Sequence, residues 1–283
     1  GSTEASASWD DAELEKELKD RYEEAQVLSV ALGGRNFVDA WTLEYQAGYS
    51  SAEQDTPDDT TSLFLGEGFT LGYGNIGQEI GVFGDAATAD PANYALDEIS
   101  RAGSKTEDEE VSYRLDVTRD LFFGDVPAMI KFGGKARLRE KTLDEREILY
   151  DGFPGDPTLE AFATPIDDYD LDAPFIGPAI DAQAMAAFIG ANVASFDVDD
   201  EETFIASAGN DFEISEDVYA AYLMSRVELG SLRLVGGIRW ERTELEAAGS
   251  TILLSDLADE PRIVPFLSDT SYDDFMPSIT ARW

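Results

Sequence analysis

Three pairs of runs in which apolar and polar residues alternate constrain the fold of this chain more than any other feature. The pairs occupy residues 26–34 and 40–50, 111–120 and 128–141, and 218–229 and 232–241, and a last run covers 272–283. Alternation with a period of two is typical of β-strands that have one apolar face. The third pair flanks Gly230-Ser231, a dipeptide that suits a two-residue hairpin turn. The pattern therefore predicts an all-β, antiparallel, up-and-down arrangement of strands.

The two faces of these strands differ in chemistry. Because alternate side chains of a strand point to opposite faces, we expect one apolar row and one cationic row. Within 128–141 the apolar row is Ile130, Phe132, Gly134, Ala136 and Leu138, and the cationic row is Lys131, Lys135, Arg137 and Arg139, which Arg233 and Arg239 extend in the third pair. These six cations either attract an anionic ligand or pair across strands with Glu228, Glu241 and Asp116.

The connections between the runs alternate between short and long. We expect long loops at about 51–110, 142–217 and 244–271, and residues 142–217 alone contain 20 acidic residues against one basic residue, Arg146. All but one of the runs have about 9 to 12 residues, which is the length that a tilted strand needs to cross a bilayer. Short turns at one end and long polar loops at the other are typical of outer-membrane barrels, with the short turns on the periplasmic side. Residues 26–283 are therefore predicted to form a segment of an antiparallel, up-and-down outer-membrane β-barrel.

Residues 1–25 have a different pattern. Leu14, Leu18 and Tyr22 recur every four residues, and Glu15 precedes Lys19 by four, as on an exposed helix. We predict a charged helical or frayed lead-in over this range.

The charge balance and two missing residue types exclude several kinds of function. The chain has 59 Asp and Glu against 20 Lys and Arg, a formal net charge of −39, whereas nucleic-acid binding needs the opposite balance. It has no histidine and no cysteine, which removes Ser-His triads, thiolate nucleophiles and the usual zinc ligands. We predict that the protein is not an enzyme, has no catalytic residues and binds no nucleic acid.

One glycine motif matches a dinucleotide-binding pattern. Residues 72–77 read Gly-Tyr-Gly-Asn-Ile-Gly, but such a site needs a helix directly after the motif. Residues 78–91 contain Gly81, Gly84 and Pro91 and show no helical stripe. A glycine-rich strand or loop is the interpretation we adopt.

Two acidic clusters have the oxygen ligands that a hard cation prefers. They lie at residues 167–172 and 197–202, and a solvated loop is the alternative interpretation of each. The candidate metal ligands are Asp168, Asp170, Asp172, Asp199 and Asp200. We expect no cofactor other than Ca²⁺ bound by these loops.

Several segments, taken in order, resemble TonB-dependent receptors of the alphaproteobacterial type. They are Leu18-Lys19-Asp20-Arg21-Tyr22-Glu23, the stretch from Gly33 to Tyr45, Asp90-Pro91-Ala92-Asn93-Tyr94, Val126-Pro127 with Lys131 to Lys135, the stretch from Tyr219 to Thr243, and Tyr272-Asp273-Asp274-Phe275-Met276-Pro277-Ser278. The resemblance implies a barrel of about 22 strands closed by an N-terminal plug. It also implies the bacterial outer membrane, and import of a scarce nutrient driven through TonB.

The chain departs from that family in what it contains. We recognise about seven or eight strands, no plug and no TonB box, so we expect a partial barrel whose natural chain continues beyond Trp283. The expected partners are outer-membrane lipid, a small nutrient such as a siderophore chelate, cobalamin or an oligosaccharide, and TonB through a plug that this chain lacks.

A different class of protein stays open, namely a soluble secreted β-sandwich that binds carbohydrate or Ca²⁺ through acidic loops. In a sandwich the apolar row faces a dry core between two sheets, whereas in a barrel it forms an outward band flanked by aromatic residues.

Overall fold

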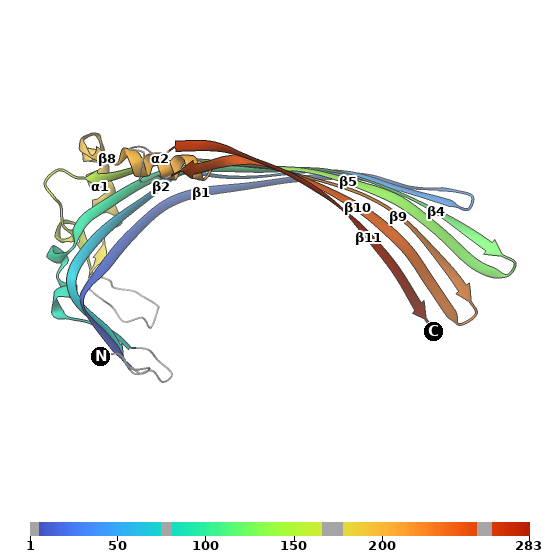
Figure 1. The fold of residues 1–283 in the computed structure, drawn as a ribbon, viewed down its shortest axis with the longest axis horizontal. Helices are drawn as coiled ribbons and strands as arrows, with labels where there is room; N and C mark the ends of the chain where they lie inside the picture. Colours follow the sequence, from blue (N-terminus) through green and yellow to red (C-terminus); the bar gives the residue numbers. More distant parts are fainter. Residues whose placement is uncertain (1–5, 75–80, 166–177, 254–261) are drawn as a thin grey trace. The chain divides into compact units, whose positions relative to one another are not determined.

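The computed structural model describes residues 6–74, 81–165, 178–253 and 262–283. Long strands dominate these residues, and the helices are few and short (Figure 1). The strands are β1 (Ala7–Val38), β2 (Trp41–Gly74), β3 (Gly81–Gly84), β4 (Ala95–Phe123), β5 (Val126–Gly152), β6 (Ala163–Thr164), β7 (Ala179–Ile180), β8 (Asp197–Val198), β9 (Phe212–Leu229), β10 (Leu232–Leu253) and β11 (Arg262–Arg282). The helices are α1 (Ala182–Asn192), α2 (Asp200–Gly209) and the short 3-10 turns η1 (Ala86–Ala89), η2 (Pro91–Asn93), η3 (Leu159–Ala161) and η4 (Val193–Ser195).

The long strands form one meandering sheet. Among the described residues its order is β1-β2-β4-β5-β9-β10-β11, with β3 paired to β2 and β8 to β5. Strand β5 pairs with β9, β9 with β10 and β10 with β11, each antiparallel. Each long strand therefore lies beside the next long strand in the chain, and the predicted antiparallel up-and-down arrangement is confirmed. The other sheet of the described part is the pair β6-β7 of two residues each, so the described residues do not form the two packed sheets of the alternative β-sandwich.

The chain divides into two compact units. Unit 1 contains residues 1–22, 56–103 and 146–207, and unit 2 contains residues 23–55, 104–145 and 208–283. The boundaries fall inside β1, β2, β4 and β5, so each of these strands contributes one part to each unit. The six predicted cations all lie in unit 2.

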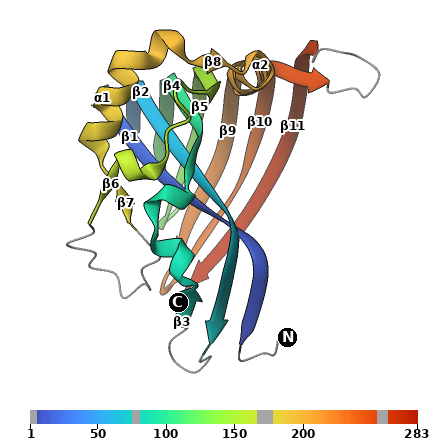
Figure 2. The ribbon, with the colours of Figure 1, turned by 90° about the vertical axis from the view of Figure 1, so that its left-hand side faces the viewer.

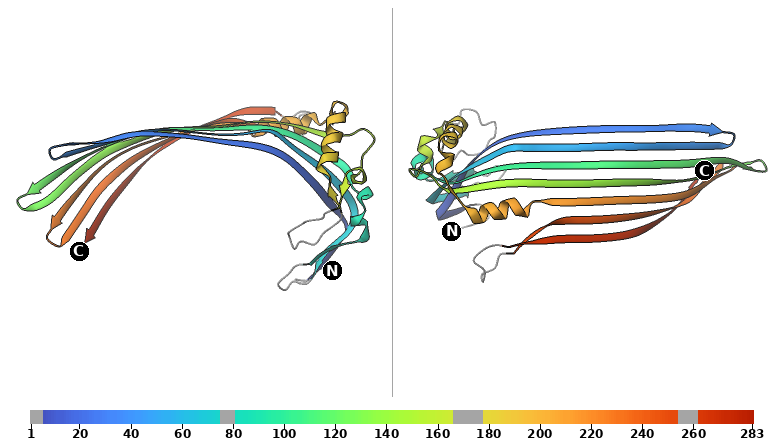
Figure 3. Two further views of the ribbon diagram at one scale, coloured as in Figure 1. Left: turned by 180° about the vertical axis from the view of Figure 1, so that it is seen from behind. Right: turned by 90° about the horizontal axis from the view of Figure 1, so that it is seen from above.

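Three two-residue turns lie at the same end of unit 2 (Figure 3). They are Asp39-Ala40, Gly124-Asp125 and Gly230-Ser231. The first residue of each turn has a positive φ, 52° at Asp39, 65° at Gly124 and 62° at Gly230, as the type II′ turns of tight hairpins require. The third turn is where the sequence predicted it. The first two are shorter than the gaps of 35–39 and 121–127 that separate the runs of the first and second pairs in the sequence.

The predicted helical lead-in at residues 1–25 is wrong, because residues 7–38 form β1. A spacing of four fits a helix, but it is also an even number, so it keeps residues on one face of a strand. Burial along β1 alternates from Ala12 to Leu18, and Leu14 and Leu18 pack against the core of unit 1. Tertiary packing therefore selects the strand.

The predicted loop bounds at 51–110, 142–217 and 244–271 are also wrong. Strand β2 continues to Gly74 and β4 starts at Ala95; β5 continues to Gly152 and β9 starts at Phe212; β10 ends at Leu253 and β11 starts at Arg262. Both faces of these extensions carry polar residues, so the alternation that reveals a strand in sequence is lost there. Backbone pairing with neighbouring strands does not depend on that alternation.

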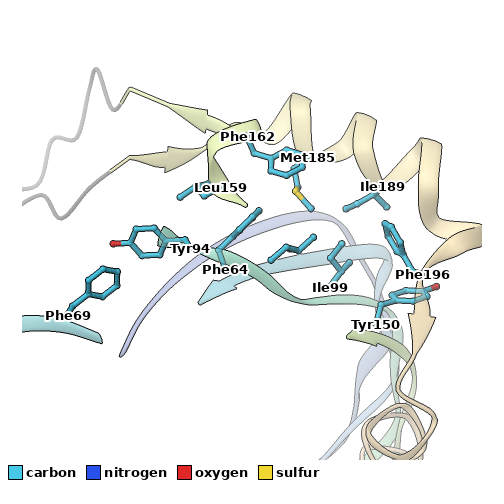
Figure 4. Close-up of a cluster of buried hydrophobic side chains, with 11 residues drawn as sticks. Phe64, Phe69, Tyr94, Ile99, Tyr150, Leu159, Phe162, Met185, Ile189 and Phe196 are labelled. Atoms are coloured by element: carbon cyan, nitrogen blue, oxygen red, sulfur yellow. The ribbon is translucent and has the colours of Figure 1, made fainter. Parts of the chain in front are cut away.

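Unit 1 has a hydrophobic core of its own (Figure 4). Tyr94, Phe64, Ile99 and Leu159 are fully buried in it. Aromatic contacts connect its parts, with ring centroids 5.7 Å apart for Phe64 and Phe162 and 5.6 Å apart for Tyr150 and Phe196. The core thus joins β2, β4 and β5 to the connection between β5 and β9.

Helix α1 packs one of its faces against this core. Met185 and Ile189 lie one helical turn apart, and both are buried in the cluster, so this stripe of α1 faces the core. Figure 2 shows α1 beside the unit 1 portions of β1 and β2. The Asp181 carboxylate caps α1 by accepting hydrogen bonds from the backbone N–H groups of Gln183 at 2.9 Å and Ala184 at 3.0 Å. Among the described residues, no helix combines the length and the apolar character needed to span a bilayer.

Candidate functional site

The register of unit 2 aligns the rows predicted on single strands into two continuous faces. Lys135 is opposite Ala220, and Ala220 is opposite Glu241. All six predicted cations therefore lie on one face, which we call the polar face. The other, apolar face carries Phe132 opposite Leu223, and Leu223 opposite Ile238.

A buried carboxylate organises the polar face. Asp116 of β4 is 1% exposed and accepts a hydrogen bond from the Tyr222 hydroxyl at 2.7 Å. Arg114 Nη2 lies 2.6 Å and Lys131 Nζ 3.8 Å from the second carboxylate oxygen. These partners compensate the cost of removing a charged carboxylate from water.

Gly133 makes this arrangement sterically feasible. It lies on β5, between β4 and β9, opposite Tyr222. A Cβ at this position would come within 2.4 Å of Asp116 Oδ1, 2.6 Å of the Leu115 carbonyl oxygen and 2.8 Å of the Tyr222 ring. The missing side chain therefore lets Asp116 and Tyr222 meet across the middle strand.

Five of the six predicted cations are paired with acids, as one of the two sequence interpretations expected. Arg233 lies 2.9 Å from Glu228, Arg239 Nε donates to Glu241 at 3.1 Å, and Lys131 contacts Asp116 and Glu44. Arg137 pairs with Glu216, and Arg139 Nε donates to Asp108 at 2.8 Å. Lys135 is exposed and has no carboxylate partner within the part of the chain that the structure describes.

A pocket of about 340 Å³ opens beside Asp116 on the polar face. Its polar lining consists of Gln46, Ser112, Arg114, Asp116, Lys135, Tyr222 and Arg239. Arg114 is ion-paired with Asp116 and Arg239 with Glu241, so among the described residues Lys135 is the cation of this lining without a carboxylate partner. The pocket therefore offers one available cation beside several hydrogen-bond donors, which suit an anionic or oxygen-rich ligand.

The apolar face of unit 2 ends in a row of aromatic residues bonded to acids. Tyr219 donates its hydroxyl to Asp217 at 3.0 Å, and Tyr49 donates to Glu109 at 2.8 Å. Trp240 Nε1 donates to Asp273 at 2.9 Å. In each case the carboxylate marks the start of a polar stretch. We call these three aromatic residues with their acids the aromatic boundary.

The candidate metal ligands are not gathered into a site in the described residues. Asp168, Asp170 and Asp172 lie outside those residues. Asp199 caps α2, accepting from the backbone N–H groups of Glu201 at 3.0 Å and Glu202 at 2.9 Å, and Asp200 is in the first turn of that helix. No group of three or more acidic side chains in the described part is arranged to hold a metal ion. Ca²⁺ binding by these loops stays a prediction.

The glycine motif at 72–77 lies partly outside the described residues. Its first three residues, Gly72 to Gly74, end strand β2 and pair with β3, Gly72 opposite Phe83 and Gly74 opposite Gly81. These three glycine-rich positions are strand, as we interpreted them.

Burial shifts several titratable groups of unit 1. Burial, with a smaller effect of Asp85, raises the pKa of the Tyr94 hydroxyl to about 12, and that hydroxyl donates to the Thr88 carbonyl oxygen at 2.7 Å. The Lys16 ammonium lies 5.0 Å from the Tyr94 ring centroid, and burial lowers its pKa. Burial, followed by the charges of Asp97 and Glu147, raises the pKa of Glu98.

The sequence analysis identified two cations of the pocket, Lys135 and Arg239, but missed most of the other residues that line it. Arg114, Tyr222 and Gln46 line the pocket but belong to different strands far apart in sequence. The available signal was Gly133, a glycine in the polar row, since glycine inside a strand often marks the close approach of another group.

No protein-family model and no curated protein matches the sequence. Among solved structures, the chain is similar to two crystal forms of the ferric-catecholate import receptor Fiu from Escherichia coli K12. For the closed form the TM-score is 0.35 at 10% identity, covering 86% of this chain and 31% of that one. For the open form the TM-score is 0.38 at 11% identity, covering 98% of this chain and 51% of that one. The chain thus spans about a third to a half of those receptor structures.

Proposed function

We propose that this chain is part of an outer-membrane barrel of the TonB-dependent receptor type. The apolar face of unit 2 contacts lipid, and the polar face lines the barrel interior. The whole protein imports a scarce nutrient and receives energy from TonB through a plug domain supplied outside this chain.

One observation carries the proposal, namely the continuous apolar face of unit 2. On β9 its row runs from Leu229, beside the turn, to Tyr219 and is interrupted by Ser225. Ten residue steps at about 3.4 Å make about 34 Å along the strand, which a tilt of about 45° reduces to about 24 Å. Outer-membrane barrels have an apolar band about 25 Å tall with aromatic residues at its edges. The exposure of Leu223 at 52% and Ile238 at 48% is then explained by lipid contact.

The pocket beside Asp116 favours one nutrient class. Within the described residues Lys135 supplies a cation without a carboxylate partner, and Arg114 and Arg239 add N–H donors although each is ion-paired with an acid. The Tyr222 oxygen and Gln46 add neutral polar groups. Guanidinium and ammonium groups bind carboxylates and other oxyanions strongly where water is restricted. Of a siderophore chelate, cobalamin and an oligosaccharide, an anionic siderophore chelate fits this set best.

The proposal is tested by the detergent dependence of the purified chain. Light scattering is measured with and without detergent, and gel migration is compared for boiled and unboiled samples. We expect a monodisperse species in detergent only, with a folded band that shifts on boiling. A compact monomer without detergent would contradict the membrane assignment.

A further inference from the structure

A pocket of about 230 Å³ lies wholly within unit 1 and is lined by helix α1 and by strands β1, β2 and β4. The apolar part of its lining comes from one face of α1, which includes Met185, Ile189 and Gly190. The polar part consists of Asp20 of β1, Asp58, Thr60 and Ser62 of β2, and Arg101 of β4. The described residues that line it include no aromatic ring, so a sugar ring or a nucleobase has nothing to stack on there.

The polar part of the lining continues rows of residues that build the core of unit 1. On β2, Ser62 precedes the core residue Phe64 by two, and on β4, Arg101 follows the core residue Ile99 by two. Alternate residues of a strand point to the same face. Figure 4 shows Met185 and Ile189 pointing from α1 towards Ile99. The pocket is therefore the polar end of a packed interface between α1 and the sheet, and the core fixes its walls.

Opposite charges line this pocket without neutralising each other. Within the described residues, neither Arg101 nor Asp20 forms an ion pair or a side-chain hydrogen bond. Asp58 accepts one hydrogen bond, from Thr60 Oγ1 at 3.2 Å. An anion would be attracted by Arg101 and repelled by the two carboxylates, and a cation would meet the reverse. A small molecule that carries both charges is attracted by both sets of groups.

The hydroxyl group of Ser62 points to a ligand independently of these charges. Ser62 is 1% exposed and lines the pocket, yet its side chain forms no hydrogen bond within the part of the chain that the structure describes. The large majority of buried polar side-chain atoms in folded proteins are hydrogen-bonded. A polar group of an occupant would supply the partner that the hydroxyl lacks.

We propose that this pocket binds a free α-amino acid with an aliphatic side chain. The ammonium group of the ligand binds to Asp20 and Asp58, and its carboxylate binds to Arg101. The aliphatic side chain packs on Met185 and Ile189. Pockets for drug-sized molecules have about 300–1,000 Å³, so 230 Å³ suits a ligand of this smaller size. The site goes beyond the proposed function, because all of its residues belong to unit 1.

Titration calorimetry of the full chain with L-leucine tests the proposal. Two further probes keep the branched carbon skeleton of leucine and one of its charges, since isocaproate lacks the ammonium group and isoamylamine lacks the carboxylate. We expect one L-leucine per chain, and binding of each analogue that is weaker by about tenfold or more. The absence of saturable L-leucine binding, or equal binding of either analogue, would overturn the proposal.

Filling the pocket should block binding while α1 stays folded. A Cβ at Gly190 meets no atom within 4 Å, and glycine inside a helix is less favourable than leucine. Gly190→Leu therefore occupies the pocket without straining α1. Ala191→Leu adds a larger side chain to the exposed side of α1, outside the lining, and is the matched control. The affinity for L-leucine should fall by about tenfold or more in Gly190→Leu only, and equal affinities in the two variants would overturn the proposal.

Charge-removing variants test which group binds which end of the ligand. In Arg101→Gln, L-leucine should lose its advantage over isoamylamine, and in Asp58→Asn it should lose its advantage over isocaproate. Arg146→Gln removes an exposed arginine of unit 1 that lies outside the pocket, so both advantages should persist. If Arg146→Gln weakens L-leucine binding as much as Arg101→Gln does, the pocket is not responsible and the proposal is overturned.

Discussion

The Tyr222 hydroxyl donates a hydrogen bond of 2.7 Å to the buried carboxylate of Asp116, although 106 residues and a whole strand separate the two. The contact passes over Gly133, where β5 presents no side chain. It joins β4 to β9 across β5 on the polar face. Its partners, Arg114 and Lys131, also belong to different strands. The cluster therefore fixes the relative register of three strands and shapes the pocket beside it.

Substitution of Gly133 should destabilise unit 2. In Gly133→Ala the new Cβ meets both a backbone carbonyl oxygen and Asp116 at under 3 Å, and overpacking of this kind costs about 1–3 kcal/mol. The temperature at which the folded gel band disappears should fall. In the control Gly236→Ala, the nearest atom is the Ser278 carbonyl oxygen at 3.8 Å, so that temperature should change little. Equal shifts in both variants would contradict the role assigned to Gly133.

Removal of the Tyr222 hydroxyl should weaken the cluster. Tyr222→Phe leaves Asp116 with one donor fewer, and a hydrogen bond to a charged group contributes about 1.5–3 kcal/mol. Denaturant unfolding in detergent measures the loss. Tyr113→Phe, on the exposed apolar face, is the matched control. If the hydrogen bond is responsible, Tyr222→Phe should cost much less in an Asp116→Ala background, which offers the Tyr222 hydroxyl no side-chain acceptor.

Lys135 should contribute to anion binding. It lines the pocket and is free of carboxylate partners within the described residues, so its charge is available to a ligand. In Lys135→Gln, the Kd for a ferric tricatecholate chelate, measured by titration calorimetry, should rise about tenfold, or about 1.4 kcal/mol. Lys141→Gln removes a lysine of the same face that lies by Phe212, outside the pocket. An equal loss in Lys141→Gln would show that only the general charge of the face matters.

The cap of α1 should control the local stability of unit 1. Asp181→Ala removes two hydrogen bonds to the backbone of α1, at a cost of about 0.5–2 kcal/mol. Hydrogen exchange at Met185 and Ile189 should accelerate, while exchange in unit 2 stays unchanged. Asp151→Ala, an exposed acid of β5, serves as the control. Uniform acceleration in both units would mean that they do not unfold separately.

Glu98 should make unit 1 more stable at mildly acidic pH. Burial and then neighbouring acids raise its pKa above the ordinary value of 4.5. The folded state therefore binds a proton at a higher pH than the unfolded state, and stability rises as the pH falls from above the raised pKa towards 4.5. Glu98→Gln should be more stable than the parent at pH 8 and should lose part of this pH dependence. Thermal unfolding at pH 5 and pH 8 measures both, and an unchanged pH dependence would contradict the assignment.

The sequence by itself determined the strand pairs of unit 2 and the face of each cation. Alternation with a period of two is a local property, so Lys131, Lys135 and Arg239 could be assigned to one row from their own strands alone. The turn at Gly230-Ser231 was equally local, because glycine tolerates the positive φ that the turn requires.

Only the tertiary structure decided three further features: the strand at the N-terminal lead-in, the extensions of the long strands and the site around Asp116. The lead-in became a strand because Leu14 and Leu18 pack on a core built from distant segments, and no local signal distinguishes that from a helix. The extensions of β2, β4 and β5 are held by backbone pairing, which requires no alternating sequence. They are also held by the core of unit 1, which is assembled from segments far apart in the chain. The site around Asp116 depends on register, and register brings Arg114 and Tyr222 together through contacts that no single strand encodes.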